Sequence, residues 1–164
     1  MTLETLNDLY VQQLRDIYDA EQQLVEALPE MAVNATHPEL RKAFESHLEE
    51  TKEQVRRLKK IFARLGEDPE GETCDGMEGI ISEGEELLEM DADDDVLDAG
   101  LLAGAQHAEH YEIAGYGTLA TYAQLLGEKA DHELLTETLK EEKEADAKLT
   151  KIAKSVVNPE AVSA

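Results

Sequence analysis

Apolar residues recur along this chain at spacings of three and four positions, which is the period of an amphipathic helix. Four long stretches show the pattern, over residues 3–35, 38–65, 95–126 and 129–156, and a shorter one covers residues 75–89. No stretch has the alternating pattern of a half-buried β-strand. The pattern therefore predicts an all-α protein.

Residues that begin or end helices separate these stretches. Thr2 is suited to cap the first helix, and Pro29 lies inside it, where a proline can kink a helix. Gly66 and Gly127 follow the second and third long stretches as C-terminal caps. The acids at 91–95 suit the N-terminus of the third long helix.

The connection lengths predict the order of the helices in space. Short turns near residues 36 and 127 make the first two and last two long helices antiparallel hairpins, while residues 66–93 form a long connection. About 28 residues, half of them helical, can reach from one end of a bundle to the other. We therefore expect a ferritin-like four-helix bundle over residues 1–158, with one long crossover that contains a short fifth helix. Residues 159–164 are expected to form a frayed tail.

Composition narrows the classes of partner. The 164 residues include 38 acidic and 15 basic side chains, for a formal charge of −23. No basic patch is available for nucleic acid, and no run approaches the roughly 20 apolar residues of a membrane span. The first residues lack the basic and apolar regions of a signal peptide, so a cytoplasmic location is expected. The many negative charges of this chain repel one another, and molar salt screens that repulsion. A halophilic host is therefore our hypothesis, with an acidic protein of an ordinary cytosol as the alternative.

Cysteine usage limits the chemistry further. Cys74 is the only cysteine, which excludes an intramolecular disulfide and a thiolate metal cluster. A metal bound by this chain must therefore use oxygen and nitrogen ligands.

Acidic residues interrupt the apolar face of every long helix near its middle. The inward positions, one or two per helix, are Glu21, His47 with Glu50, Glu109 with Glu112, and Glu142 with Asp146. With hairpin turns near 36 and 127, Glu21 lies level with Glu50, and Glu109 lies level with residue 146. The helical phase does not by itself decide between Glu141 and Glu142; Glu142 is preferred because it keeps phase with Leu139 and Asp146.

Buried carboxylates that converge would repel one another unless they bind protons or cations. A pair of divalent cations removes the repulsion, and carboxylates with some imidazole suit iron or manganese. The alternative is that these acids lie on the solvent-exposed faces of their helices. Acids are so frequent in this chain that any single glutamate assigned to the inner face is more often an exposed residue. Matched heights on four helices favour the metal site.

The remaining histidines are less suited to bind a metal. His37 and His132 are expected in solvated turns, and His107 and His110 flank Glu109, where one of them can orient a carboxylate. Tyr116 is expected in the core, where a hydroxyl near a redox metal can donate a hydrogen bond.

Several of these residues belong to motifs of a known family. The stretches that carry the resemblance are Asp16-x-Tyr18-x-Ala20-Glu21-x-Gln23, His47-Leu48-Glu49-Glu50-Thr51, Met77-Glu78-Gly79, Glu109-His110-Tyr111-Glu112-Ile113-Ala114-x-Tyr116-Gly117-Thr118-Leu119 and Glu141-Glu142-Lys143-x-x-Asp146-x-Lys148-Leu149. Over about residues 1–156 the chain resembles the YciE/YciF family of ferritin-like proteins. The resemblance implies a four-helix bundle, a di-metal centre, a homodimer and a link to stress responses.

The chain departs from the wider ferritin pattern, in which Glu-x-x-His stands on two helices. Here the second helix has the reverse order, His47-x-x-Glu50, and the fourth offers Glu142 and Asp146 without a histidine. This departure leaves the metal and its oxygen chemistry open.

The main hypothesis is a centre of two iron ions that oxidises Fe(II) with oxygen or peroxide. Glu21, His47 and Glu50 would hold one ion, Glu109, Glu142 and Asp146 the other, and Glu112 would be terminal or bridging. One alternative is a manganese-dependent peroxide scavenger with the same ligands. The other is a non-enzymatic, dimeric helical stress protein.

Overall fold

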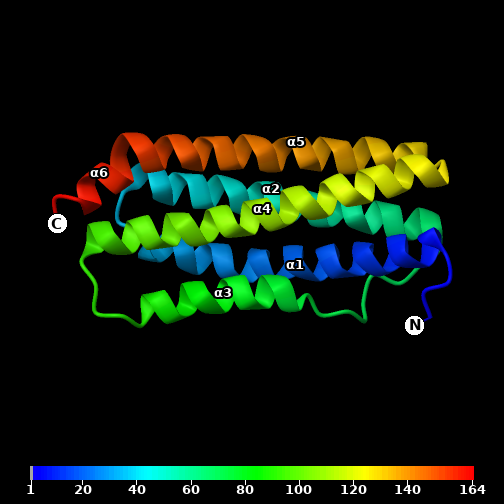
Figure 1. The fold of residues 1–164 in the computed structure, drawn as a ribbon, viewed down its shortest axis with the longest axis horizontal. Helices are drawn as coiled ribbons and strands as arrows, with labels where there is room; N and C mark the ends of the chain where they lie inside the picture. Colours follow the sequence, from blue (N-terminus) through cyan, green and yellow to red (C-terminus); the bar gives the residue numbers. More distant parts are fainter. Residues whose placement is uncertain (1) are drawn as a thin grey trace.

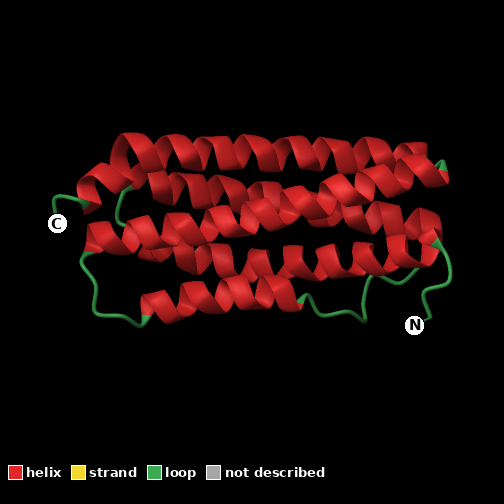
Figure 2. Cartoon of the chain, viewed as in Figure 1, coloured by secondary structure: helices red, strands yellow, loops and turns green. Residues whose placement is uncertain are grey.

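A computed structural model describes residues 2–164 as a bundle of long helices (Figures 1 and 2). The helices are α1 (Leu6–Asn34), α2 (Pro38–Leu65), α3 (Asp75–Leu88), α4 (Asp94–Leu126), α5 (Lys129–Ile152) and α6 (Asn158–Ala161), with a π-helical turn over Ala153–Val157. No strand occurs among the described residues. The predicted all-α fold is confirmed.

The four long helices α1, α2, α4 and α5 form the bundle, and α3 lies outside it along α1 and α4 (Figure 1). The pairs α1–α2 and α4–α5 are antiparallel hairpins with short turns. The segment between α2 and α4, which includes α3, returns the chain along the length of the bundle. This is the ferritin-like arrangement with one long crossover, as the connection lengths predicted.

The helix ends follow local chemistry, with one correction. The first helix is capped by Thr5 rather than Thr2, because Thr5 and Asp8 form a capping box in which the Asp8 N–H donates to Thr5 Oγ1 (3.2 Å) and the Thr5 N–H to Asp8 Oδ2 (2.8 Å). The helix then continues through Pro29 to Asn34. Gly66 and Gly127 cap α2 and α4 at φ of 69° and 83°, where glycine avoids the strain of a side chain.

Buried aspartates fix both ends of the bundle. At one end Asp98 on α4, 2% exposed, accepts hydrogen bonds from the Thr36 N–H, the Thr36 hydroxyl and the His37 N–H in the α1–α2 turn. At the other end Asp131 on α5 accepts from Arg64 on α2 and from Tyr10 on α1. These contacts hold one hairpin in register with the other, and so set the heights at which their inward side chains meet.

The C-terminal segment keeps helical geometry beyond α5. The π-turn buries Ala153 and Val157 against the bundle, and α6 extends regular structure to Ala161, into the segment 159–164 that was expected to fray. None of the helices within residues 2–164 combines the length and the apolar character needed to cross a bilayer.

Candidate metal centre

Five potential ligands are buried at the middle of the bundle. They come from all four long helices, and each is at most 9% exposed: Glu21 on α1, His47 on α2, Glu109 and Glu112 on α4, and Glu142 on α5. The spacing of three between Glu109 and Glu112 puts both on the inner face of α4. The sequence predicted each of these five residues as inward.

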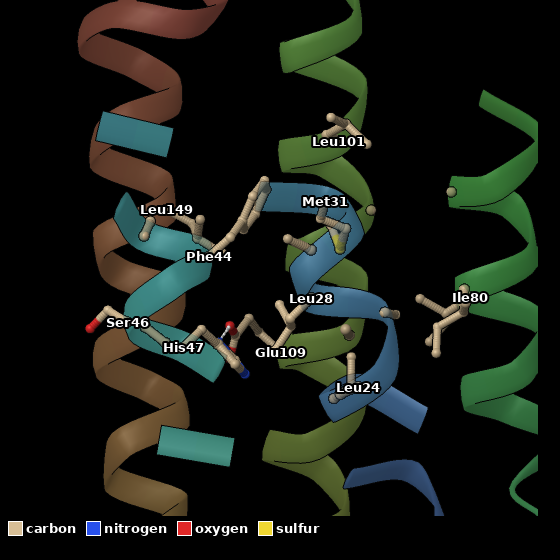
Figure 3. A pocket seen from close by; sticks show the side chains of 18 of the residues that line it. Leu24, Leu28, Met31, Phe44, Ser46, His47, Ile80, Leu101, Glu109 and Leu149 are labelled. Atoms are coloured by element: carbon tan, nitrogen blue, oxygen red, sulfur yellow. Dashed lines mark ion pairs between the residues drawn. The ribbon is translucent and has the colours of Figure 1, made fainter. Parts of the chain in front are cut away.

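These five residues form the cluster, and four of them make a compact group. His47, Glu109, Glu112 and Glu142 each offer one ligand atom, and these atoms lie within 4.8 Å of one another. Figure 3 shows His47 and Glu109 pointing toward each other from α2 and α4. His47 Nδ1 is 2.6 Å from Glu109 Oε1, so the ring donates from Nδ1 and keeps the Nε2 lone pair available for a metal.

Polar neighbours position two of the carboxyl groups. The Tyr116 hydroxyl donates to Glu21 Oε1. Gln54 on α2 donates from Nε2 to Glu142 Oε1. These contacts leave the second oxygen of each carboxyl group turned to the cluster without a partner of its own.

Buried polar atoms without a hydrogen-bond partner gather at this cluster. Within residues 2–164, seven buried side-chain nitrogen or oxygen atoms have no hydrogen-bond partner, and all lie on the cluster or on Gln54 beside it: Glu21 Oε2, His47 Nε2, Gln54 Oε1, Glu109 Oε2, both Glu112 oxygens and Glu142 Oε2. Six are oxygens, and the seventh is an imidazole nitrogen. Unpartnered buried polar groups are rare because each is costly. Here all of them are potential electron-pair donors to a cation.

Burial and like charge raise the pKa of every carboxyl group in the cluster. Burial is the main cause for Glu21, whose pKa rises to about 8 with a further contribution from the Glu142 charge. Burial likewise raises the pKa of Glu109 to about 8, with Asp146, Glu21 and Glu50 adding to the shift. Glu112 and Glu142 also have pKa values well above the ordinary range, chiefly because they are buried. Without a cation, the cluster therefore holds protons near neutral pH.

These residues fit a carboxylate-bound metal pair. Hard oxygen donors with a single imidazole suit Fe(II) or Mn(II), and bound cations replace the protons that the crowded carboxyl groups otherwise retain. Glu112 is fully buried and both of its oxygens lack a partner, so both are available to a cation.

Two predicted ligands lie farther out. Glu50 is half-buried and accepts from Ser46 Oγ at 3.3 Å, and Asp146 is half-buried with Oδ1 3.0 Å from Gln106 Nε2 and 3.2 Å from His110 Nε2. Neither belongs to the compact group of four, although both carboxylates raise the pKa of Glu109. Asp146 does lie at the predicted level, since it contacts Gln106 and His110 on either side of Glu109, but it is Glu142 that joins Glu109 in the compact group.

The choice between Glu141 and Glu142 depends on Arg57. Glu142 is fully buried in the cluster, while Glu141 points to Arg57 and accepts two hydrogen bonds from its guanidinium group, at 2.5 and 2.8 Å. Arg57 thus holds the neighbouring acid outside the centre.

The other histidines and the cysteine lie elsewhere. His107 and His110 are exposed, and His37 caps α2. His132 is half-buried, with its Nδ1 2.8 Å from the Ala120 carbonyl oxygen. Cys74 is buried directly before α3, with its thiol 3.0 Å from the Tyr111 hydroxyl.

Sequence reasoning missed Gln54 and Arg57 as residues that shape the site. Both are polar side chains on the apolar face of α2, in helical phase with His47 or Leu58, and both are at most 8% exposed. Their position on the apolar face of α2 was the signal in the sequence. The pattern of one helix does not reveal their partners on α5.

Comparison with known proteins agrees with this architecture. Residues 5–162 match the family described as a domain of unknown function (DUF892). The chain is 43% identical to protein YciF of Escherichia coli strain K12 over 162 residues, which cover 98% of each chain.

Solved structures show the same fold. The E. coli stress protein YciF superposes with a TM-score of 0.91, covering 95% of this chain and 99% of that one at 43% identity. YcfI from Rhodopseudomonas palustris superposes with a TM-score of 0.86 at 47% identity, covering 90% and 94%. A protein of Xanthomonas campestris pv. campestris shares the fold, with a TM-score of 0.76 at 22% identity and 94% coverage of both chains. The chain therefore belongs to the YciE/YciF family, the family described as DUF892.

Proposed function

We propose that this chain binds two ferrous ions at the cluster of Glu21, His47, Glu109, Glu112 and Glu142 and oxidises them with oxygen or peroxide. The observation that carries the proposal is the set of seven unpartnered donor atoms, all of which lie on this cluster or on Gln54 beside it. Protons alone do not satisfy these atoms, whereas two divalent cations would use most of them.

Each residue has a role that its contacts suggest. His47 would bind through Nε2 while Nδ1 stays bonded to Glu109, and Glu112 would bind through its two unpartnered oxygens. Tyr116 and Gln54 would act as positioning residues, since each holds one oxygen of a ligand carboxyl group. Glu50 and Asp146 would complete the ligand set from the outer edge of the centre.

Two ferrous ions supply two electrons, which together with two protons convert hydrogen peroxide into two molecules of water. Because E. coli YciF is described as a stress protein, we place this activity in a stress response.

An anaerobic titration with Fe(II) in high salt, followed by oxygen or hydrogen peroxide, tests the proposal. We expect saturation near two ions per chain and rapid oxidation. Glu112→Gln keeps the shape of the side chain but removes its charge, and should lose saturable binding. The matched control is Glu133→Gln on the exposed face of α5. Absence of saturable binding to the unaltered chain would contradict the proposal.

A parallel titration with Mn(II) tests the alternative metal. Carboxylate-rich sites accept manganese as well as iron. Peroxide decomposition that requires Mn(II) and does not occur with iron would identify a manganese-dependent peroxide scavenger instead.

A further inference from the structure

A cavity of about 290 Å³ lies beside the cluster and reaches His47 and Glu109 (Figure 3). It passes between α1, α2, α4 and α5 and extends to α3 on the outside of the bundle. The cavity is partly open to solvent, since its lining includes exposed residues such as Glu85 and Lys148. A concave, mainly apolar site of this size beside a candidate metal centre is typical of small-molecule binding.

The walls of the cavity are mainly aliphatic. Figure 3 shows Leu24, Leu28, Met31, Phe44, Ile80 and Leu101 around it. Small residues on α4 make the space, because Gly104, Ala105 and Ala108 line it where larger side chains would fill it. Such walls match the carbon skeleton of an apolar molecule.

The charges around the cavity exclude one class of apolar ligand. Besides His47 and Glu109, its charged lining consists of Glu30, Glu50, Glu85, Glu141, Glu144 and Lys148. Five carboxylates against one ammonium group repel an anion, and the chain as a whole carries −23. A fatty acid carboxylate is therefore disfavoured, and a neutral molecule is favoured.

The volume of the cavity also disfavours the smallest oxidants as its only ligands. A water molecule takes up about 30 Å³ in the liquid, so the cavity has room for on the order of ten non-hydrogen atoms. Molecular oxygen and hydrogen peroxide have two such atoms each and would leave most of the space unused.

We propose that the cavity binds the hydrocarbon part of a neutral alkyl or arylalkyl hydroperoxide and directs its peroxide group to the cluster at His47 and Glu109. This inference rests on the proposed iron oxidation and names its oxidant. Two ferrous ions give two electrons, the O–O bond of the hydroperoxide breaks, and with two protons the products are an alcohol, water and two ferric ions.

Gly104 offers a variant that fills the cavity without disturbing the helix. A Cβ atom at Gly104 meets no heavy atom within 4 Å, and the residue lines the cavity. Gly104→Leu therefore places an aliphatic side chain in the free space, and leucine also favours the helix more than glycine does. Gly79→Leu is the matched control, because Gly79 lies on α3 with equally free space but outside the cavity lining.

The first measurement needs no metal. Cumyl alcohol, the product of cumene hydroperoxide reduction, is titrated into the metal-free chain by calorimetry. We expect saturable binding at one molecule per chain, weakened at least tenfold by Gly104→Leu and unchanged by Gly79→Leu. No saturable binding to the unaltered chain, or equal binding to both variants, would overturn the inference.

The second measurement compares oxidants on the Fe(II)-loaded chain. The ratio of the oxidation rate with cumene hydroperoxide to that with hydrogen peroxide should fall at least tenfold in Gly104→Leu and stay constant in Gly79→Leu. Oxidation by hydrogen peroxide without binding of cumyl alcohol overturns this inference alone and leaves the proposed function standing. Binding of the alcohol to a chain that never takes up Fe(II) overturns both.

Discussion

Tyr116 on α4 donates its hydroxyl proton to Glu21 Oε1 on α1, and both side chains are almost completely buried. The contact joins one helix of each hairpin at the level of the candidate centre. Burial and the Glu21 charge raise the pKa of Tyr116 well above its ordinary value, so the phenol remains a donor at any physiological pH. The bond holds one oxygen of Glu21 and leaves the other free.

Tyr116→Phe should destabilise the metal-free protein. The substitution leaves Glu21 Oε1 buried without a donor, which costs on the order of 1–3 kcal/mol. Urea unfolding measures the change in the free energy of unfolding. Tyr122→Phe, at a half-buried tyrosine on the same helix, is the control, and an equal loss in both variants would contradict a specific role for the bond.

The metal-free protein should become less stable as the pH rises from about 5 to 8. Glu21 has a pKa near 8 when folded, so between its ordinary value of 4.5 and 8 the folded state holds a proton that the unfolded state releases. Stability falls with pH wherever the folded state binds more protons. Below that window the proton is bound in both states, and above it in neither.

Glu21→Gln isolates this effect, because glutamine does not titrate. The variant's stability relative to the unaltered chain should increase with pH across the window, by up to about 1 kcal/mol per pH unit. Unfolding curves at pH 5, 6.5 and 8 without metal give the comparison. A difference that is constant with pH would contradict the raised pKa of Glu21.

Glu141 and Glu142 form a natural matched pair. Glu142→Gln should abolish saturable Fe(II) binding, because Glu142 is a buried member of the cluster. Glu141→Gln should keep the metal stoichiometry and lower stability, since Arg57 loses the carboxylate that accepts two of its hydrogen bonds. Metal titration and thermal unfolding of both variants separate the two roles, and loss of metal binding in Glu141→Gln would refute the assignment.

Asp98→Ala should reduce stability by at least about 2 kcal/mol, because the Thr36 N–H, the Thr36 hydroxyl and the His37 N–H lose their shared acceptor. Asp91→Ala, at an exposed position before α4, should change stability by less than about 0.5 kcal/mol. Chemical denaturation compares the two. Similar losses would show that Asp98 is not a specific tie between the α1–α2 turn and α4.

Salt should stabilise this chain. A formal charge of −23 opposes the compact state, and molar salt shortens the screening length to about 3 Å. The melting temperature should therefore rise by several degrees between 0.1 and 2 M potassium chloride, as the hypothesis of a halophilic host requires. A melting temperature that is independent of salt would favour the ordinary cytosol.

The amino-acid sequence was sufficient for the fold. Leu14, Ile17 and Leu24 repeat with the helical period, and Gly66 and Gly127 end helices because glycine adopts positive φ without strain. The helices and their ends could therefore be identified without knowledge of distant contacts. The start of the first helix was wrong by three residues, because Thr2 and Thr5 are both suitable caps and only Thr5 has Asp8 at the reciprocal position. Connection lengths then left few ways to arrange four long helices.

For the candidate centre, helical phase predicted which side chains turn inward, but only the tertiary structure decided which of them meet. Glu142 rather than Asp146 joins Glu109 in the compact group, because the rotation of α5 turns Asp146 toward Gln106 and His110 although its height matches that of Glu109. The pairing of Gln54 with Glu142 and of Arg57 with Glu141 likewise depends on which sides of α2 and α5 pack together. These two helices are far apart in the sequence. Periodicity is a property of one helix, whereas contact across a bundle depends on the relative shift and rotation of two, and a single sequence encodes these only through the packing of the whole core.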